Sequence, residues 1–151
     1  MKTMTPIAIH TRFNPWIAKT YISLIIAKYI QGEYSHIAYL VEEPGGLFVF
    51  ESSGELGGVV KTPYMKWREV NRDKSTNYLK PVPYINDFNL VVGKDYDYGN
   101  VFNRFLEITF RLKIDRDNPQ RFTCSELGAW ARGLSKGYRV NPQDIVEGCL
   151  A

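Results

Sequence analysis

Side chains that carry sulfur or imidazole are scarce in this sequence, which has two cysteines, Cys124 and Cys149, and two histidines, His10 and His36. So few cysteines exclude a disulfide-rich scaffold. No C-x-x-C or H-x-x-x-H spacing occurs, which argues against a self-contained zinc cluster. We therefore expect no metal and no cofactor. One nucleophilic thiol and one imidazole base are still allowed.

A long uninterrupted apolar run is also missing. The most apolar stretch, from Trp16 to Ile30, contains Lys19 and Lys28 and is shorter than the roughly 20 residues that a membrane-spanning helix needs. The first ten residues hold no long apolar segment and no convincing cleavage site, so no secretion signal is predicted. We expect a cytoplasmic protein without a transmembrane segment, and a phage-encoded origin is compatible with that.

The remaining composition is that of one globular domain spanning 1–151. The chain has a mass of 17.4 kDa and is 44% hydrophobic, enough to bury a core without disulfide bonds. Its net charge is +3, and basic residues gather between Lys66 and Lys80 and between Arg111 and Arg121. Either group could meet phosphate or an anionic polymer, but no nucleic-acid motif accompanies them. A solvated surface is the favoured interpretation, and no nucleic-acid partner is expected.

Hydrophobic periodicity and turn signals predict an α+β fold. A hairpin is expected around the Glu43-Pro44-Gly45-Gly46 turn. The expected strands are 34–41, 47–52, 58–62 and 77–82, and the expected helices are 15–32, 84–92, 98–112, 124–134 and a short one from Pro142 toward Cys149.

Cys124 lies at the predicted start of a helix. Thr123-Cys124-Ser125-Glu126 fits a capping box, in which the threonine hydroxyl accepts from the glutamate amide and the carboxylate reaches back. The helix dipole and first-turn amides favour a thiolate, and the amides of Ser125 and Glu126 could help to hold an oxyanion. The helix face that Cys124 shares is small and apolar, so the thiol should point at the sheet. A buried cysteine that only fills space is the alternative.

His36 lies in the first strand of the predicted hairpin. A turn centred after Glu43 would place His36 opposite Glu51, and opposed residues of an antiparallel pair share a face. A charged Glu51 on an otherwise apolar face needs a partner, and His36 is the obvious one. The pair is then either an oriented base or a structural pair that fixes strand register. A one-residue slip would bring Ser52 or Ser53 across instead.

Together these residues form a cysteine–histidine–acid set. The base would take the thiol proton, and the acid would orient the imidazole and stabilise its charged form. His10 has no obvious acid, and Cys149 lies in a terminal stretch prone to fraying. The segment Asp95-Tyr96-Asp97-Tyr98 has two carboxylates and no histidine, so we interpret it as a helix start rather than a metal site.

Several motifs follow one another in a fixed order along the chain. They are Ser35-His36-Ile37-Ala38, Phe48-Val49-Phe50-Glu51-Ser52, Gly58-Val59, Gly93-Lys94-Asp95-Tyr96-Asp97-Tyr98, Phe122-Thr123-Cys124-Ser125-Glu126-Leu127 and Asn141-Pro142-Gln143-Asp144-Ile145. This series resembles the circularly permuted NlpC-type, papain-like cysteine hydrolases of the YiiX-like group, with lecithin:retinol acyltransferase as a more distant relative. In the permuted members the histidine precedes the acid and the cysteine comes last, which is the order of His36, Glu51 and Cys124.

The resemblance implies a small antiparallel sheet with the cysteine helix packed against it. It implies Cys124 as nucleophile, His36 as base and Glu51 as orienting residue. The family hydrolyses amide or ester bonds, or transfers acyl groups, through a thioester, so a peptide, peptidoglycan or acyl substrate is expected. An acyltransferase or thioesterase for lipid-like acyl groups and a non-catalytic binding module are the alternatives. By proximity in sequence alone, Ser125, Tyr34 and Thr123 are candidate oxyanion or substrate-binding residues.

Overall fold

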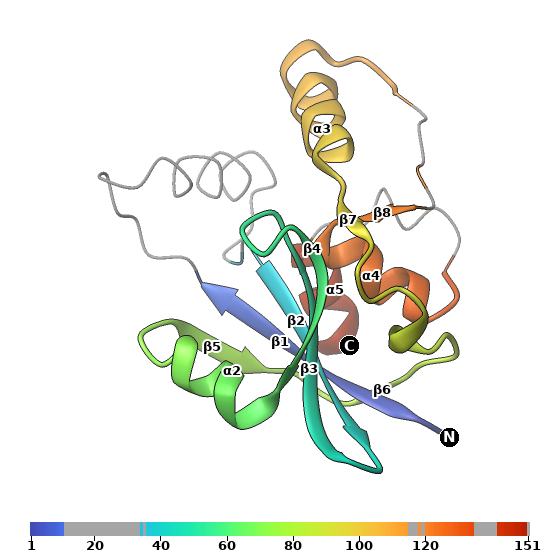
Figure 1. Cartoon of the computed structure of the whole chain (residues 1–151). Helices are drawn as coiled ribbons and strands as arrows, with labels where there is room; N and C mark the ends of the chain where they lie inside the picture. The colour runs from blue at the N-terminus through green and yellow to red at the C-terminus, as the bar shows by residue number, and fades with distance from the viewer. Residues whose placement is uncertain (11–33, 35, 115–117, 119, 135–141, 151) are drawn as a thin grey trace.

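The computed structural model describes residues 1–10, 34, 36–114, 118, 120–134 and 142–150 (Figure 1). The architecture is α+β, as predicted, and is built on a six-stranded sheet whose paired strands are antiparallel. The strand order is β4-β3-β2-β1-β5, and β6 also pairs with β1. The strands are β1 (Thr3–His10), β2 (His36–Glu43), β3 (Gly46–Ser53), β4 (Gly58–Pro63), β5 (Ser75–Tyr78) and β6 (Val82–Pro83).

Strand β1 was not predicted, although it lies inside the sheet between β2 and β5. Its residues Pro6 to Ile9 are all buried, so the strand has no polar alternation that would mark it in the sequence. Pro6 lacks an amide donor and argues against an inner strand. Its carbonyl nevertheless accepts a hydrogen bond from the amide of Leu79 at 2.9 Å. Burial on both faces explains why this segment forms a strand only in the context of its neighbours.

The predicted hairpin is present as β2 and β3, but its register differs from the prediction by two residues. Glu43 pairs with Gly46 across a turn of Pro44 and Gly45, and Tyr39 therefore pairs with Phe50. The predicted pairing of His36 with Glu51 is wrong in register. The turn is centred after Pro44 instead of after Glu43, and moving the centre of a hairpin by one residue changes every pairing by two residues. A shift of two residues keeps every side chain on its predicted face.

Different helices cover the two faces of the sheet (Figure 1). Helices α4 (Cys124–Ala131) and α5 (Pro142–Leu150) contribute to the larger core, and α4 contacts β2 and β3 as expected for the cysteine helix. Helix α2 (Tyr64–Val70), which was not predicted, places Trp67 in a second core on the other face.

The remaining elements lie between β5 and α4 in the chain. The predicted helix at 84–92 is wrong, since this segment forms only a 3-10 turn, η1 (Phe88–Leu90), before Gly93 adopts a positive φ of 88°. The two-residue strands β7 (Asp95–Tyr96) and β8 (Arg121–Phe122) pair in parallel. Helix α3 (Tyr98–Phe110) begins where predicted, and the predicted helix at 15–32 lies outside the described residues. Within the described ranges, no helix is long and apolar enough to cross a membrane.

Candidate active site

The start of α4 has the predicted capping box. The Thr123 hydroxyl accepts from the Glu126 amide at 3.3 Å, and the Glu126 carboxylate accepts from the Thr123 amide at 2.6 Å. Asn100 of α3 donates to the other carboxylate oxygen of Glu126 at 2.8 Å. The Glu126 amide, one of the two predicted oxyanion donors, is therefore engaged in the helix cap.

Two side chains of the sheet hold the segment around Cys124. Tyr39 donates to the carbonyl of Cys124 at 2.9 Å, and Ser52 donates to the carbonyl of Phe122 at 2.5 Å. All of these groups are buried. A Cβ on Gly128 would lie 2.1 Å from the Tyr39 hydroxyl, so only glycine lets α4 approach β2 this closely. Strands β2 and β3 thus fix the position of the cysteine helix.

His36 is the first residue of β2, and its Nε2 lies 2.9 Å from Oε2 of Glu51. The two side chains contact each other despite the register difference, because they share a face of the hairpin. The other carboxylate oxygen, Oε1, accepts from Nε1 of Trp67 at 3.1 Å. The Glu51 side chain is only 8% exposed, compared with 22% for that of His36. A buried carboxylate is therefore held by a donor on each oxygen.

Cys124 lies close enough to His36 for its side chain to act on the pKa of the imidazole, by hydrogen bonding and by charge. Burial alone would lower the pKa of His36, but hydrogen bonds to Cys124 and Glu51 and the charges of both groups raise it to about 10. The imidazole is therefore protonated at neutral pH.

The pKa of Glu51 is shifted in the opposite direction. Burial would raise it, but the hydrogen bond and charge of His36, the hydrogen bond from Trp67 and the charge of Lys74 lower it. The site therefore combines a thiol, an imidazolium and an ionised carboxylate in series. A cysteine next to an imidazolium that an acid orients is the arrangement needed for nucleophilic attack followed by protonation of a leaving group.

The other predicted site residues lie as follows. The Tyr34 hydroxyl accepts from Asn77 at 3.3 Å, and its ring lies edge-on to His10 at 5.8 Å, so its described contacts are not with Cys124. The Thr123 hydroxyl serves the helix cap. Ser125 is buried, with its hydroxyl 3.4 Å from that of Thr123. Of these three residues, Thr123 and Ser125 adjoin the cysteine and Tyr34 contacts a different part of the sheet.

Tyr96 was missed as a site residue. It pairs with Phe122, two residues before Cys124, and the charges of Cys124 and Glu126 act on its phenol. Burial is the largest cause that raises the pKa of Tyr96, and these charges add to it, so the phenol stays a donor. Within the described part of the chain, its hydroxyl makes no hydrogen bond. The motif at 95–98 could have pointed to it, but only its helix-start role was recognised, and Asp97 does cap α3 by accepting from Asn100 at 3.0 Å.

The described residues contain no cluster of three or more histidine, cysteine or acidic side chains that could hold a metal ion. The chain matches no protein-family model and no curated protein sequence. The function of the site therefore has to be inferred from its geometry.

Proposed function

We propose that this protein is a cysteine hydrolase that cleaves an amide or ester bond through a thioester intermediate. The His36–Glu51 hydrogen bond, on an imidazole whose pKa is raised by the nearby Cys124, is the observation that supports this function most directly. The resemblance to permuted NlpC-type, papain-like hydrolases, noted from the ordered motifs, implies the same three residues in the same roles.

In the proposed reaction, the Cys124 thiolate attacks the substrate carbonyl carbon and a carbon–sulfur bond forms. The tetrahedral intermediate collapses as the His36 imidazolium gives its proton to the leaving amine or alcohol. Water then attacks the thioester while His36 accepts its proton, and cleavage of the carbon–sulfur bond releases the acid and restores the thiolate–imidazolium pair. Glu51 keeps the imidazole oriented and stabilises its charged form throughout.

Tyr96 is the candidate oxyanion donor in this proposal. Its phenol is close enough to Cys124 to be affected by the thiolate charge, and it has a free donor within the described part of the chain. A neutral donor aimed at a developing oxyanion stabilises the transition state more than the ground state. The Ser125 amide, in the first turn of α4, is the second candidate.

Peptides, including peptidoglycan peptides, are the substrate class that the resemblance implies. Helix α3 carries a feature that favours acyl groups instead. Its side chains Phe102 and Phe110, together with Tyr98 at its start, are about 60% exposed. The helix begins two residues after Tyr96. An apolar surface of this kind suits an acyl chain, so an acyltransferase or thioesterase is the second candidate function.

The test is to trap the acyl-enzyme. The protein is incubated with activated acyl esters and with peptide amides, and the intact mass of the chain is recorded over time. A transient adduct that maps to Cys124 is expected in the wild type and in Cys149→Ala, but not in Cys124→Ala. Release of the acyl group to water indicates a hydrolase, whereas transfer to an added amine or alcohol indicates a transferase. An adduct rate unchanged in Cys124→Ala contradicts both and supports a non-catalytic module.

A further inference from the structure

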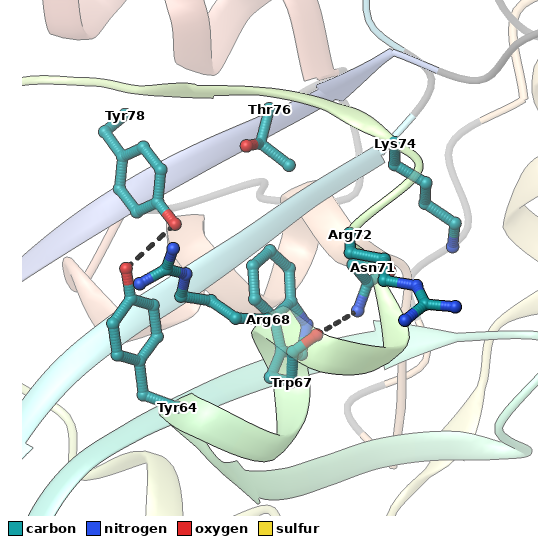
Figure 2. Close-up of a pocket in the computed structure, with 8 residues that line it drawn as sticks. All are labelled: Tyr64, Trp67, Arg68, Asn71, Arg72, Lys74, Thr76 and Tyr78. Atoms are coloured by element: carbon teal, nitrogen blue, oxygen red, sulfur yellow. Dashed lines mark hydrogen bonds between the residues drawn. The ribbon is translucent and has the colours of Figure 1, made fainter.

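A cavity lies on the α2 side of the sheet, between α2 and β5. It has a volume of about 450 Å³ and is bounded by the helix, by the turn that follows it and by β5 (Figure 2). Trp67, which donates to Glu51, is one of its lining residues. The cavity is therefore separated from the His36–Glu51 pair by a single side chain, while Cys124 does not line it.

The charge of this cavity is of one sign. Arg68, Arg72 and Lys74 line it, and no acidic side chain does. Arg72 is 4.0 Å from the carboxylate of Asp73, and both of these side chains are exposed. Within the described part of the chain, neither Arg68 nor Lys74 is within ion-pair distance of a carboxylate. Three cations around one hollow repel each other unless an anion neutralises them.

The uncharged groups of the cavity add directed hydrogen bonding. Figure 2 shows the hydroxyls of Tyr64 and Tyr78 facing each other, 3.0 Å apart, with the guanidinium of Arg68 beside them. Arg68 also lies over the Tyr64 ring at 5.8 Å, which restrains its position. Burial and the bond to Tyr64 raise the pKa of Tyr78 to about 12, so this phenol remains protonated at neutral pH. Of two hydroxyls that share one hydrogen bond, one keeps a donor for a ligand.

We propose that this cavity binds a ligand through its phosphate group, either a small phosphorylated metabolite or the headgroup of a phospholipid. Arginine forks and a lysine ammonium are the side chains best matched to phosphate oxygens, and the phenols supply further donors. A volume of about 450 Å³ accommodates more than an isolated ion, since ligand cavities of small molecules fall in the range of roughly 300–1,000 Å³. A half-open hollow with its cations around one space, rather than a continuous basic stripe, favours such a ligand over a nucleic acid.

A bound phosphate also has a consequence for the acid of the candidate active site. The positive charge of Lys74 is one of the influences that lower the pKa of Glu51. A phosphate next to Lys74 would offset that influence, and the indole of Trp67 connects the two places physically. Binding in the cavity should therefore be sensed at Glu51, although it does not depend on the proposed hydrolase activity.

The test uses two variants that lose the same charges. Arg68→Gln/Lys74→Gln removes an arginine and a lysine from the cavity, and Arg111→Gln/Lys113→Gln removes an arginine and a lysine from exposed positions elsewhere. Glycerol 3-phosphate and inorganic phosphate are titrated into each protein by calorimetry at low ionic strength. Vesicles of phosphatidylcholine with and without phosphatidic acid are tested by flotation, which separates the two sources of the phosphate group.

We expect binding of at least one phosphate probe to the wild type, a loss of about tenfold or more in the cavity variant, and a change below about twofold in the control. Lys74→Gln alone, an exposed substitution, should give an intermediate loss and serves if the double variant unfolds. Equal weakening in both double variants, or no binding of any probe to the wild type, would overturn the proposal. Because the same titrations can be run on Cys124→Ala, failure of this site is distinguishable from failure of the hydrolase.

Discussion

The two faces of the sheet treat their polar groups in different ways. On the α4 face, Tyr39 and Phe50 stack on Phe88 with ring centroids 5.7 and 5.1 Å apart, and the hydroxyls of Tyr39 and Ser52 bond to the backbone beside Cys124. On the α2 face, the cations around the cavity between α2 and β5 remain exposed. One face therefore fixes the position of Cys124 by packing, whereas the other face carries charged groups that act on Glu51.

The candidate site draws on both faces. Glu51 shares the α2 face with Ala38 and Val49 and bonds to Trp67, whereas Cys124 begins a helix that packs on the opposite face. His36 is the first residue of β2, and its side chain is 22% exposed at the end of the strand. At this position one imidazole bonds to the acid and also interacts with the thiol.

The largest expected effect comes from removing the residue that connects the two faces. His36→Ala should reduce thioester formation by about 10³-fold or more, because the thiol loses both its base and its stabilising cation. His10→Ala is the matched control and should leave the rate within about twofold. Rates of acyl-adduct formation measured by mass spectrometry decide the question, and comparable losses in both variants would remove His36 from the proposed mechanism.

The packing of the α4 face is tested by a single methyl group. Gly128→Ala places a Cβ 2.1 Å from the Tyr39 hydroxyl and should lower the free energy of unfolding by about 1–3 kcal/mol. Gly148→Ala in α5 is the control, because nothing lies within 4 Å of its added Cβ and alanine is the better helix former, by up to about 1 kcal/mol. Urea unfolding of both variants measures the contrast. Equal stability of the two variants would show that α4 does not need close contact with β2.

The charge setting of the α2 face is tested by Glu51→Gln. Loss of the carboxylate removes a hydrogen bond and a charge that raise the pKa of His36, so the pKa should fall from about 10. The alkaline limb of the rate profile should therefore move to lower pH. Glu43→Gln, which instead removes a carboxylate paired with Lys61, should leave that limb unchanged. The pH dependence of thioester formation provides the measurement, and an unmoved alkaline limb in Glu51→Gln would contradict the assignment.

The same pair gives the protein a pH-dependent stability. The folded pKa of His36 lies above its usual value of 6.5, so its contribution is fully present below that pH and is lost as pH rises toward 10. The folded pKa of Glu51 lies below 4.5, so its contribution is present above pH 4.5 and is lost at lower pH. Unfolding free energies measured between pH 4 and 10 should decline at both ends of this range. The alkaline decline should shrink in His36→Ala.

The smallest expected effect concerns the contact between the cavity and the acid. Trp67→Phe removes the donor to Oε1 of Glu51 while it keeps most of the buried ring, so stability should fall by about 0.5–1.5 kcal/mol. The His36 pKa, followed by NMR titration, should shift in the variant, because the carboxylate that faces the imidazole has lost one of its donors. An unchanged titration would show that Trp67 has only a packing role.

Features governed by neighbours in sequence could be predicted, and those governed by distant contacts could not. The Thr123 cap follows from four consecutive residues, and the helix at that position is confirmed. The contact of His36 with Glu51 was predicted from a register that proved wrong, and it is present because a two-residue shift preserves the face. Strand β1 was missed because its burial on both faces depends on β2 and β5.

The missed site residues have the same origin. Trp67 reaches Glu51 from a helix that the sequence did not reveal, since α2 is only seven residues long and has a single buried residue. Tyr96 comes to Cys124 through pairing of the two short strands β7 and β8, which carry no periodic signal. The composition nonetheless limited the candidates for nucleophile and base to two each, and one of each, Cys124 and His36, interact in the structure.

The most direct test of the central claim is the rate at which iodoacetamide alkylates the two cysteines of the wild-type protein. Peptide mapping after brief exposure at neutral pH gives separate rates for Cys124 and Cys149. If an imidazolium stabilises the Cys124 thiolate, Cys124 should react far faster than Cys149, and His36→Ala should abolish the advantage. Slow and equal alkylation of both cysteines would contradict the claim that this site holds an activated nucleophile.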